Sequence, residues 1–201
     1  MDALFASSNC LGIPDLLVDL QADCVPLPVW AWGSVARTAT HRGTWHCYVD
    51  DKRFSRVLAA PDALVSTGCV AACEPNISVY DDTPPAVAYH SLYRKRWVAR
   101  YWQSCGIRIF LDVNLPSWML SRPETLYGIP EGWRAWATRG YERRLESLDE
   151  EYEFALNASQ TTEIVFLVIG GGRKVAQWCQ RRRGVVHSGY RSTRRPYSEQ
   201  R

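Results

Sequence analysis

The chain has 201 residues, of which 46% are hydrophobic and 22% are charged, as is typical of one soluble globular domain with a sizeable core. No apolar run approaches the roughly 20 residues that a membrane-spanning helix needs. The first residues, MDALFASSNCLG, have no basic start and so do not resemble a secretory signal. We therefore expect no membrane association and a location in the cytoplasm of the host cell.

The seven cysteines include no CxxC pair and cannot all be paired within one chain. This pattern favours reduced, mostly buried thiols. His46 and Cys47, taken with Cys69 and Cys73, match no standard zinc spacing, and small buried strand residues are the simpler interpretation. We expect no bound cofactor.

Charge is distributed unevenly along the chain. The net charge is +3, but residues 173–201 carry nine Lys or Arg and one acid, which gives +8, while residues 1–172 carry −5. A basic end on a weakly acidic body is typical of a segment that contacts nucleic acid. The alternative is a solvated terminus with no partner, which we favour for the last ten residues.

Strand and helix patterns alternate in the first part of the chain. Apolar, β-rich runs bounded by Pro, Gly or Asp predict strands, and a short run that Pro61 stops predicts a helix. The predicted elements are a helical piece at 14–22, strands at 29–32, 44–49 and 64–72, and a helix at 54–60.

The longest predicted element is a helix over residues 86–105, followed by a strand over 107–113. Asp82 or Thr83 is expected to cap it, Pro84 and Pro85 suit its first turn, and Gly106 suits its C-terminal cap. Aromatic residues recur at helical spacing along it and should share one face. They are Tyr89, Tyr93, Trp97 and Tyr101.

The remainder continues the alternation after a Pro- and Gly-rich loop at 116–132. We expect strands at 133–138, 164–169 and 185–187, helices at 142–159 and 173–182, and a short turn at 117–120. The acids of the 142–159 helix are expected to face water. The all-apolar strand at 164–169 should be buried on both faces, as parallel strands are.

These elements predict an α/β fold, a single domain with a mostly parallel sheet and alternating helices. The sheet is either open or curled into a partial or irregular barrel. Residues 1–190 are expected to form the domain, and residues 191–201 a basic, flexible tail.

Three stretches together resemble a known family. They are HCYVDDKRFSRVLAAP (46–61), YDDTPPAVAYHSLYRKRWVARYWQSCGIRIF (80–110) and LYGIPEGWRAWATRGY (126–141), and the region from 46 to 141 that they span is about half the chain. They are similar to domain of unknown function 4417, found in phages, prophages and plasmids. The chain departs from the pattern at Pro75-Asn76, where relatives are expected to have Pro-Asp. The resemblance implies a fold and a mobile-element setting, and no chemistry.

Ligands of parallel α/β sheets bind beyond the carboxyl ends of the strands. The predicted strands place a definite set of side chains and glycines at that edge. The set is Asp50, Asp51, Glu74, Asn76, Asp112, Asn114, Arg139, Gly170, Gly171, Gly172 and His187.

Asp112 is the leading candidate for catalysis, because an ionised carboxylate on a buried strand is costly unless it is paired or used. With Glu74 or Asp50 it would hold a divalent metal ion for attack on a phosphoester. The alternative, which we favour, is that Asp112 caps a loop or pairs with an arginine such as Arg139.

Gly170 to Gly172 open a predicted helix, so their N–H groups, with Arg173 and Lys174, suit a phosphate. The alternative is a tight turn without a ligand. Arg181, Arg182 and Arg183 extend the same basic segment.

Arg94 and Arg96 alternate with aromatic residues, as in sites for single-stranded nucleic acid. At helical spacing the core interpretation is preferred for Tyr93 and Trp97, which leaves the two arginines as candidates. Our first hypothesis is a mobile-element protein that binds nucleic acid through these arginines and the basic C-terminal segment. The alternatives are a metal-assisted phosphoester hydrolase or nucleotide-processing enzyme centred on Asp112, and a non-catalytic protein that binds a host protein. The sequence decides neither enzyme status nor oligomeric state.

Overall fold

Seven strands form one sheet in the computed structural model, which describes residues 5–33 and 42–189. The strands stand in chain order, and each pairs in parallel with the next. They are β1 (Val29–Ala31), β2 (Thr44–His46), β3 (Ala71–Cys73), β4 (Arg108–Asp112), β5 (Ala135–Arg139), β6 (Val165–Ile169) and β7 (Val185–Ser188).

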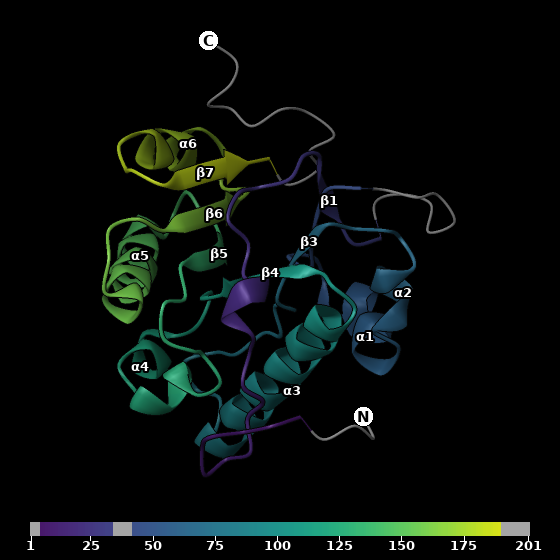
Figure 1. Ribbon diagram of the computed structural model, residues 1–201. Coiled ribbons are helices and arrows are strands. Elements are labelled where there is room, and N and C mark those ends of the chain that lie inside the picture. The colour runs from purple at the N-terminus through teal and green to yellow at the C-terminus, as the bar shows by residue number, and fades with distance from the viewer. Residues whose placement is uncertain (1–4, 34–41, 190–201) are drawn as a thin grey trace.

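A sheet in which every connection steps to the adjacent strand with the same hand collects its helices on one side. Figure 1 shows this arrangement: the strands curl into a half-barrel and the helices lie around its outside. The predicted α/β class with a parallel sheet is confirmed, and the sheet is the partial barrel rather than the flat open form.

Apart from α2, the helices follow the predicted positions closely. They are α1 (Asp51–Ala59), α2 (Asp62–Val65), α3 (Pro85–Ser104), α4 (Ser117–Leu120), α5 (Leu145–Ser159) and α6 (Gly172–Gln180), with 3-10 turns η1 (Val18–Leu20) and η2 (Pro123–Leu126). Gly106 has the left-handed backbone, with φ +82°, that the end of α3 was expected to need. None of the helices in the described part of the chain is long and apolar enough to cross a membrane.

Three local predictions are wrong. Residues 62–65 form α2, so only the end of the predicted 64–72 strand is a strand. No side chain caps α3, because the Thr83 hydroxyl accepts the Tyr80 N–H instead, at 2.8 Å. α5 begins at Leu145, three residues after its predicted start at 142, and the loop before it contains Arg143 and Arg144.

The N-terminal segment fills a split in the sheet. β4 pairs with β3 through its first half and with β5 through its second half, so its amino end has no strand on the β5 side. Gln21 bridges Ile109 there, and its side chain accepts the Arg134 N–H at 2.6 Å. η1 consequently lies over the middle of the sheet (Figure 1).

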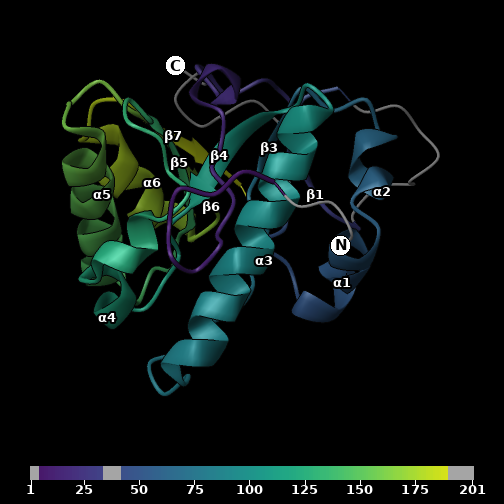
Figure 2. The same cartoon turned by 60° about the horizontal axis from the view of Figure 1, so that its bottom comes forward.

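α3 is much longer than the strand that follows it, and this difference creates the site. Nine residues of helix from Ser104 back to Lys95 span about 13 Å, and four strand steps from Arg108 to Asp112 span about the same distance. Lys95 therefore stands level with Asp112, at the carboxyl edge. Figure 2 shows the first half of α3 continuing beyond that edge.

Candidate functional site

The carboxyl edge of β3, β4 and β5 brings together five of the eleven predicted edge residues. Asn76, Asn114 and Arg139 line one cavity of about 420 Å³. Glu74 and Asp112 are buried, and a hydrogen bond joins them: Glu74 Oε2 accepts the Asp112 backbone N–H at 3.2 Å. The prediction that distant residues meet at this edge is supported for these five.

Asp112 belongs to a buried charged cluster, which we define as Glu74, Lys95, Arg96 and Asp112. Lys95 Nζ lies 2.6 Å from Asp112 Oδ2 and 3.8 Å from Glu74 Oε2, and Arg96 pairs with Glu74 Oε1. All four side chains are at most 2% exposed. Two cations thus neutralise two carboxylates, which is what burial of charge requires.

Neutral donors complete the surroundings of Asp112. The Tyr48 hydroxyl donates to Oδ1 at 2.8 Å, and Asn76 Nδ2 donates to Oδ2 at 3.1 Å. A metal ion bound by Asp112 and Glu74 would have to displace Lys95, Arg96 or these donors. The preferred interpretation of Asp112 as a paired acid agrees with the structure, although its partner is Lys95 and not Arg139.

Asp50 does not join this cluster. It is exposed, and its Oδ1 accepts the Lys52 N–H at 3.0 Å, so it caps α1. Its neighbour Asp51 accepts a hydrogen bond from the Ser78 hydroxyl at 3.0 Å. Within residues 5–33 and 42–189, no three His, Cys, Asp or Glu side chains are grouped as a metal site would need.

Arg96 was expected to be available to nucleic acid, and this expectation is wrong because its guanidinium is buried against Glu74. Arg94 is half-buried on the same helix. Trp97 is buried, stacks on Tyr101 and also packs against Phe5, as the core interpretation of the aromatic face requires.

The glycine turn after β6 has a structural explanation. A Cβ atom on Gly171 would collide with Val175 and would lie 2.8 Å from the Gly140 carbonyl carbon. Glu142 Oε1 accepts the Lys174 N–H at 3.2 Å, so a carboxylate of the chain itself already occupies the start of α6. The tight-turn interpretation accounts for these contacts, and a phosphate at the same N–H would have to displace Glu142.

His187 also supports this turn. Its Nε2 lies 2.8 Å from the Gly170 carbonyl oxygen, and burial lowers the pKa of its imidazole. His46, on β2, is fully buried, and burial together with the charge of Arg139 lowers its pKa to about 3. Both rings are therefore neutral at physiological pH, and His187 is a buried support of the edge.

α6 is nine residues and about 13 Å long, and it separates Arg173 and Lys174 at its start from the arginines at 181–183 just beyond its end. Arg182 stacks on the Trp178 ring, with Cζ 3.8 Å from its centroid, and pairs with Asp149. Arg183 lies 3.9 Å from Glu163, and Arg181 is exposed. The basic segment that the sequence treats as one unit is thus divided between two edges of the sheet.

Several side chains of the site were missed from sequence. Lys95 and Glu151 sit on the buried faces of α3 and α5, at helical spacing from Leu92 and Ala99 and from Leu148 and Ala155. A charged residue at a buried helical position can be recognised in the sequence, and it indicates a side chain that is paired or functional. Tyr48, Tyr141 and Arg144 lie in loops and have no comparable signal.

Glu151 was expected to face water and is instead 4% exposed. The Thr138 hydroxyl donates to its Oε2 at 2.6 Å, Arg144, Tyr141 and Asp112 lie around it, and burial raises its pKa well above the usual value. The carboxyl group therefore keeps its proton in the folded state at pH values where it loses it in the unfolded state.

Glu151→Gln should consequently make stability less dependent on pH. Because the folded pKa is raised, wild-type stability falls as pH rises from about 4.3, the unfolded value, to the folded pKa. Urea unfolding at pH 5, 6.5 and 8 should show the variant gaining stability over wild type as pH rises. Glu153→Gln, on the exposed side of α5, is the control. If the difference in unfolding free energy between Glu151→Gln and wild type stayed constant across this pH range, the pKa of Glu151 would not be raised.

The fold and this edge define a class: a parallel α/β half-barrel whose polar side chains gather beyond the carboxyl ends of its strands. The family described as Domain of unknown function (DUF4417) matches residues 5–166, and the chain belongs to this family.

Two curated relatives are phage proteins. The chain is 35% identical to the Gene 1 protein of Mycobacterium phage D29 and 32% identical to the Gene 1 protein of Mycobacterium phage L5, each over 137 residues. The match covers 64% of this chain in both cases, and 48% and 56% of the relatives, so the chain spans about half of their length. No solved structure matches. The chain is thus a phage protein of unknown function, as the resemblance of its motifs implied.

Proposed function

We propose that the protein binds nucleic acid through a basic edge, which we define as Arg139, Arg143, Arg144, Arg173 and Lys174. Arg139 is the last residue of β5, and the other four follow β5 or β6. The last residues of these two neighbouring strands, Arg139 and Ile169, are paired in register. Both loops therefore leave the sheet at the same level and side by side.

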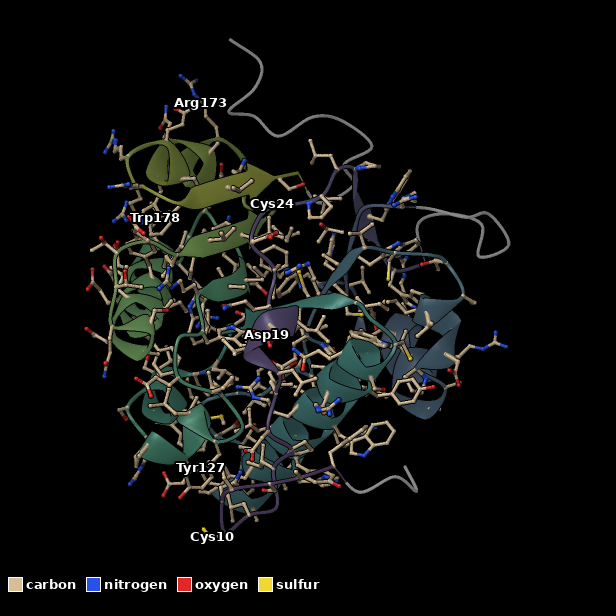
Figure 3. All side chains as sticks on the ribbon, viewed as in Figure 1. Cys10, Asp19, Cys24, Tyr127, Arg173 and Trp178 are labelled. Atoms are coloured by element: carbon tan, nitrogen blue, oxygen red, sulfur yellow. The ribbon has the colours of Figure 1, made fainter. Side chains whose placement is uncertain are left out.

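The single observation that carries the proposal is the imbalance of charge on these two loops. Residues 139–144 and 170–174 contain five Lys or Arg and one acid, Glu142. Arg143, Arg144, Arg173 and Lys174 are exposed, and a hollow of about 500 Å³ lies between the loops. The labelled Arg173 side chain points away from α6 into solvent (Figure 3). Exposed cations on one edge with few acids attract the phosphates of a polyanion.

β7 ends at the same edge of the sheet as β5 and β6. Ser188 pairs with Ile169, so β7 also ends at this level. Residues 190–201, which contain four arginines and one glutamate, follow in sequence and lie outside the described residues, as does the predicted tail at 191–201. The proposal therefore narrows the first hypothesis to the carboxyl edge of β5 to β7 and leaves out Arg94, Arg96 and the arginines at 181–183.

Neutralising the basic edge should weaken binding and reduce its salt dependence. In the variant Arg143→Gln/Arg173→Gln/Lys174→Gln, three exposed cations are lost. Affinity for a labelled single-stranded oligonucleotide should fall at least about tenfold at low salt, and the slope of log K against log[salt] should become shallower by about 0.7 per lost phosphate contact. Fluorescence anisotropy between about 25 and 200 mM salt measures both, the range over which such contacts lose most of their affinity.

The matched control is Lys52→Gln/Arg53→Gln/Arg56→Gln on α1, which removes three exposed cations from another side of the molecule (Figure 1). It should keep most of the affinity. Equal losses in the two triple variants, or no binding by wild type at the lowest salt, would refute the proposed surface. Single- and double-stranded DNA and RNA probes, compared in parallel, identify the kind of nucleic acid.

The hydrolase alternative is supported by the closeness of Asp112 and Glu74 and opposed by their pairing with Lys95 and Arg96. We infer that the buried charged cluster stabilises the carboxyl edge and does not bind metal. Because its carboxylates are already paired, we rank nucleic-acid binding above hydrolysis as the proposed function.

A further inference from the structure

The cavity at the carboxyl edge adjoins the basic edge and shares Arg139 and Arg144 with it. Its walls come from the loop after β3, the loop after β4, and the loop and first turns that follow β5. A volume of about 420 Å³ is within the range of small-molecule sites. Arg143, Arg173 and Lys174 do not line it, so its occupancy can be tested apart from the nucleic-acid surface.

The cavity has two buried polar side chains with unused hydrogen-bonding capacity. Asn76 is 5% exposed and Glu151 is 4% exposed, and both line the cavity. Asn76 bonds Asp112 through Nδ2, and Glu151 accepts from Thr138 through Oε2. Among the described residues the Asn76 Oδ1 and Glu151 Oε1 atoms have no protein partner. Because both side chains line the cavity, they present hydrogen-bonding groups to a molecule bound there.

Two arginines supply positive charge on one wall. Arg139 is half-buried and its Cζ lies 4.9 Å from the centroid of the Tyr141 ring, while the Arg144 Cζ lies 6.0 Å from it. Guanidinium groups present paired donors that suit phosphate oxygens.

The residues at the mouth of the cavity restrict which chemical groups a ligand can have besides a phosphate. Asp81 and Asp82 are exposed there beside Tyr80, which is 66% exposed. Carboxylates accept hydrogen bonds from sugar hydroxyls and repel further phosphates. Tyr80 and Tyr141 offer flat faces to a planar ring.

We propose that this cavity binds a nucleoside monophosphate, with the phosphate on Arg139 and Arg144 and the base edge at Asn76 and Glu151. An amide and a protonated carboxyl each offer a donor and an acceptor, which is what the edge of a nucleobase requires. The proposal goes beyond nucleic-acid binding, because it concerns a single free nucleotide and adds Asn76 and Glu151 to the two arginines, Arg139 and Arg144, that also belong to the basic edge.

Calorimetric titration of the full chain with the ribo- and deoxyribonucleoside monophosphates tests the proposal directly. We expect at least one to bind with a Kd of about 1 mM or tighter. The corresponding nucleoside, inorganic phosphate and nucleoside triphosphate should each bind at least about tenfold more weakly, a difference of about 1.4 kcal/mol. No heat from any monophosphate, or inorganic phosphate binding as tightly as the nucleotide, would overturn the proposal.

Two neighbouring arginines form a matched pair of variants. Arg144→Gln should weaken the monophosphate at least about tenfold, the size of loss expected for a direct charged contact, whereas Arg143→Gln should leave it unchanged. Both residues are exposed, so both variants should fold, which circular dichroism checks. Equal losses in the two variants would show non-specific attraction and refute the site. The Arg143→Gln/Arg173→Gln/Lys174→Gln variant, which should be defective in nucleic-acid binding, should still bind the monophosphate. The two proposals can therefore be tested separately, and either can fail without the other.

Discussion

Replacing Lys95 by Met should lower the free energy of unfolding by about 3–5 kcal/mol, the cost of leaving a buried charge unpaired. Lys95 is fully buried and contacts both Asp112 and Glu74. Without it, Arg96 alone faces two buried carboxylates. Met has a similar length and apolar stem, so the loss of stability would result from the missing charge and not from a cavity. Urea denaturation with a linear extrapolation measures the change.

Two further variants show whether charge is the cause. Lys95→Met/Asp112→Asn removes one charge of each sign and should recover part of the lost stability. Lys52→Met, on the exposed side of α1, should change stability by at most about 0.5 kcal/mol. A Lys95→Met variant about as stable as wild type would mean that the buried charged cluster does not hold the edge together.

Gly171→Ala is expected to cost about 2–4 kcal/mol, from a left-handed backbone combined with a steric clash. Gly171 has φ +83°, and an added Cβ would meet Val175 and the backbone of Gly140. Because these contacts join the ends of β5 and β6 to the start of α6, the substitution should separate the two loops of the basic edge. Thermal or urea unfolding measures the cost.

Gly172→Ala is the matched control for this turn. Gly172 also has a positive φ, of +64°, but its Cβ would meet only the end of the Glu142 side chain. Its cost should therefore be confined to the backbone, about 1–2 kcal/mol. If Gly171→Ala kept full stability while nucleic-acid binding fell, the glycines would be ligand contacts, and the tight-turn interpretation would be wrong.

The edge residues could be predicted because they follow strands that are easily recognised. The run Ile164–Ile169 is all apolar, and Ile107–Val113 is apolar around Arg108, so both indicate buried parallel strands. Once strands alternate with helices, Asn76, Asn114 and Arg139 must meet at one edge. The structure places all three around one cavity.

The partners of these residues were harder to predict. Asp112 was expected to cap a loop or to pair with an arginine such as Arg139. It does cap the loop after β4, since its Oδ1 accepts the Asn114 N–H at 3.1 Å, but its charged partner is Lys95, seventeen residues earlier in the chain. The choice depends on the length of α3 relative to β4, which sets the height at which each helix residue meets the sheet. Patterns of hydrophobicity locate a buried face but do not state which charge lies opposite it.

By itself, the sequence determined the α/β class, the order of the elements and the residues that follow each strand, because apolar spacing and Gly and Pro positions are local properties. Only the tertiary structure decided that Arg96 and Glu151 are buried, that Glu142 occupies the start of α6, and that Arg173 and Arg181 lie at opposite edges. Those outcomes depend on the curl of the sheet and the lengths of its helices, since burial and pairing are set by segments distant in the chain.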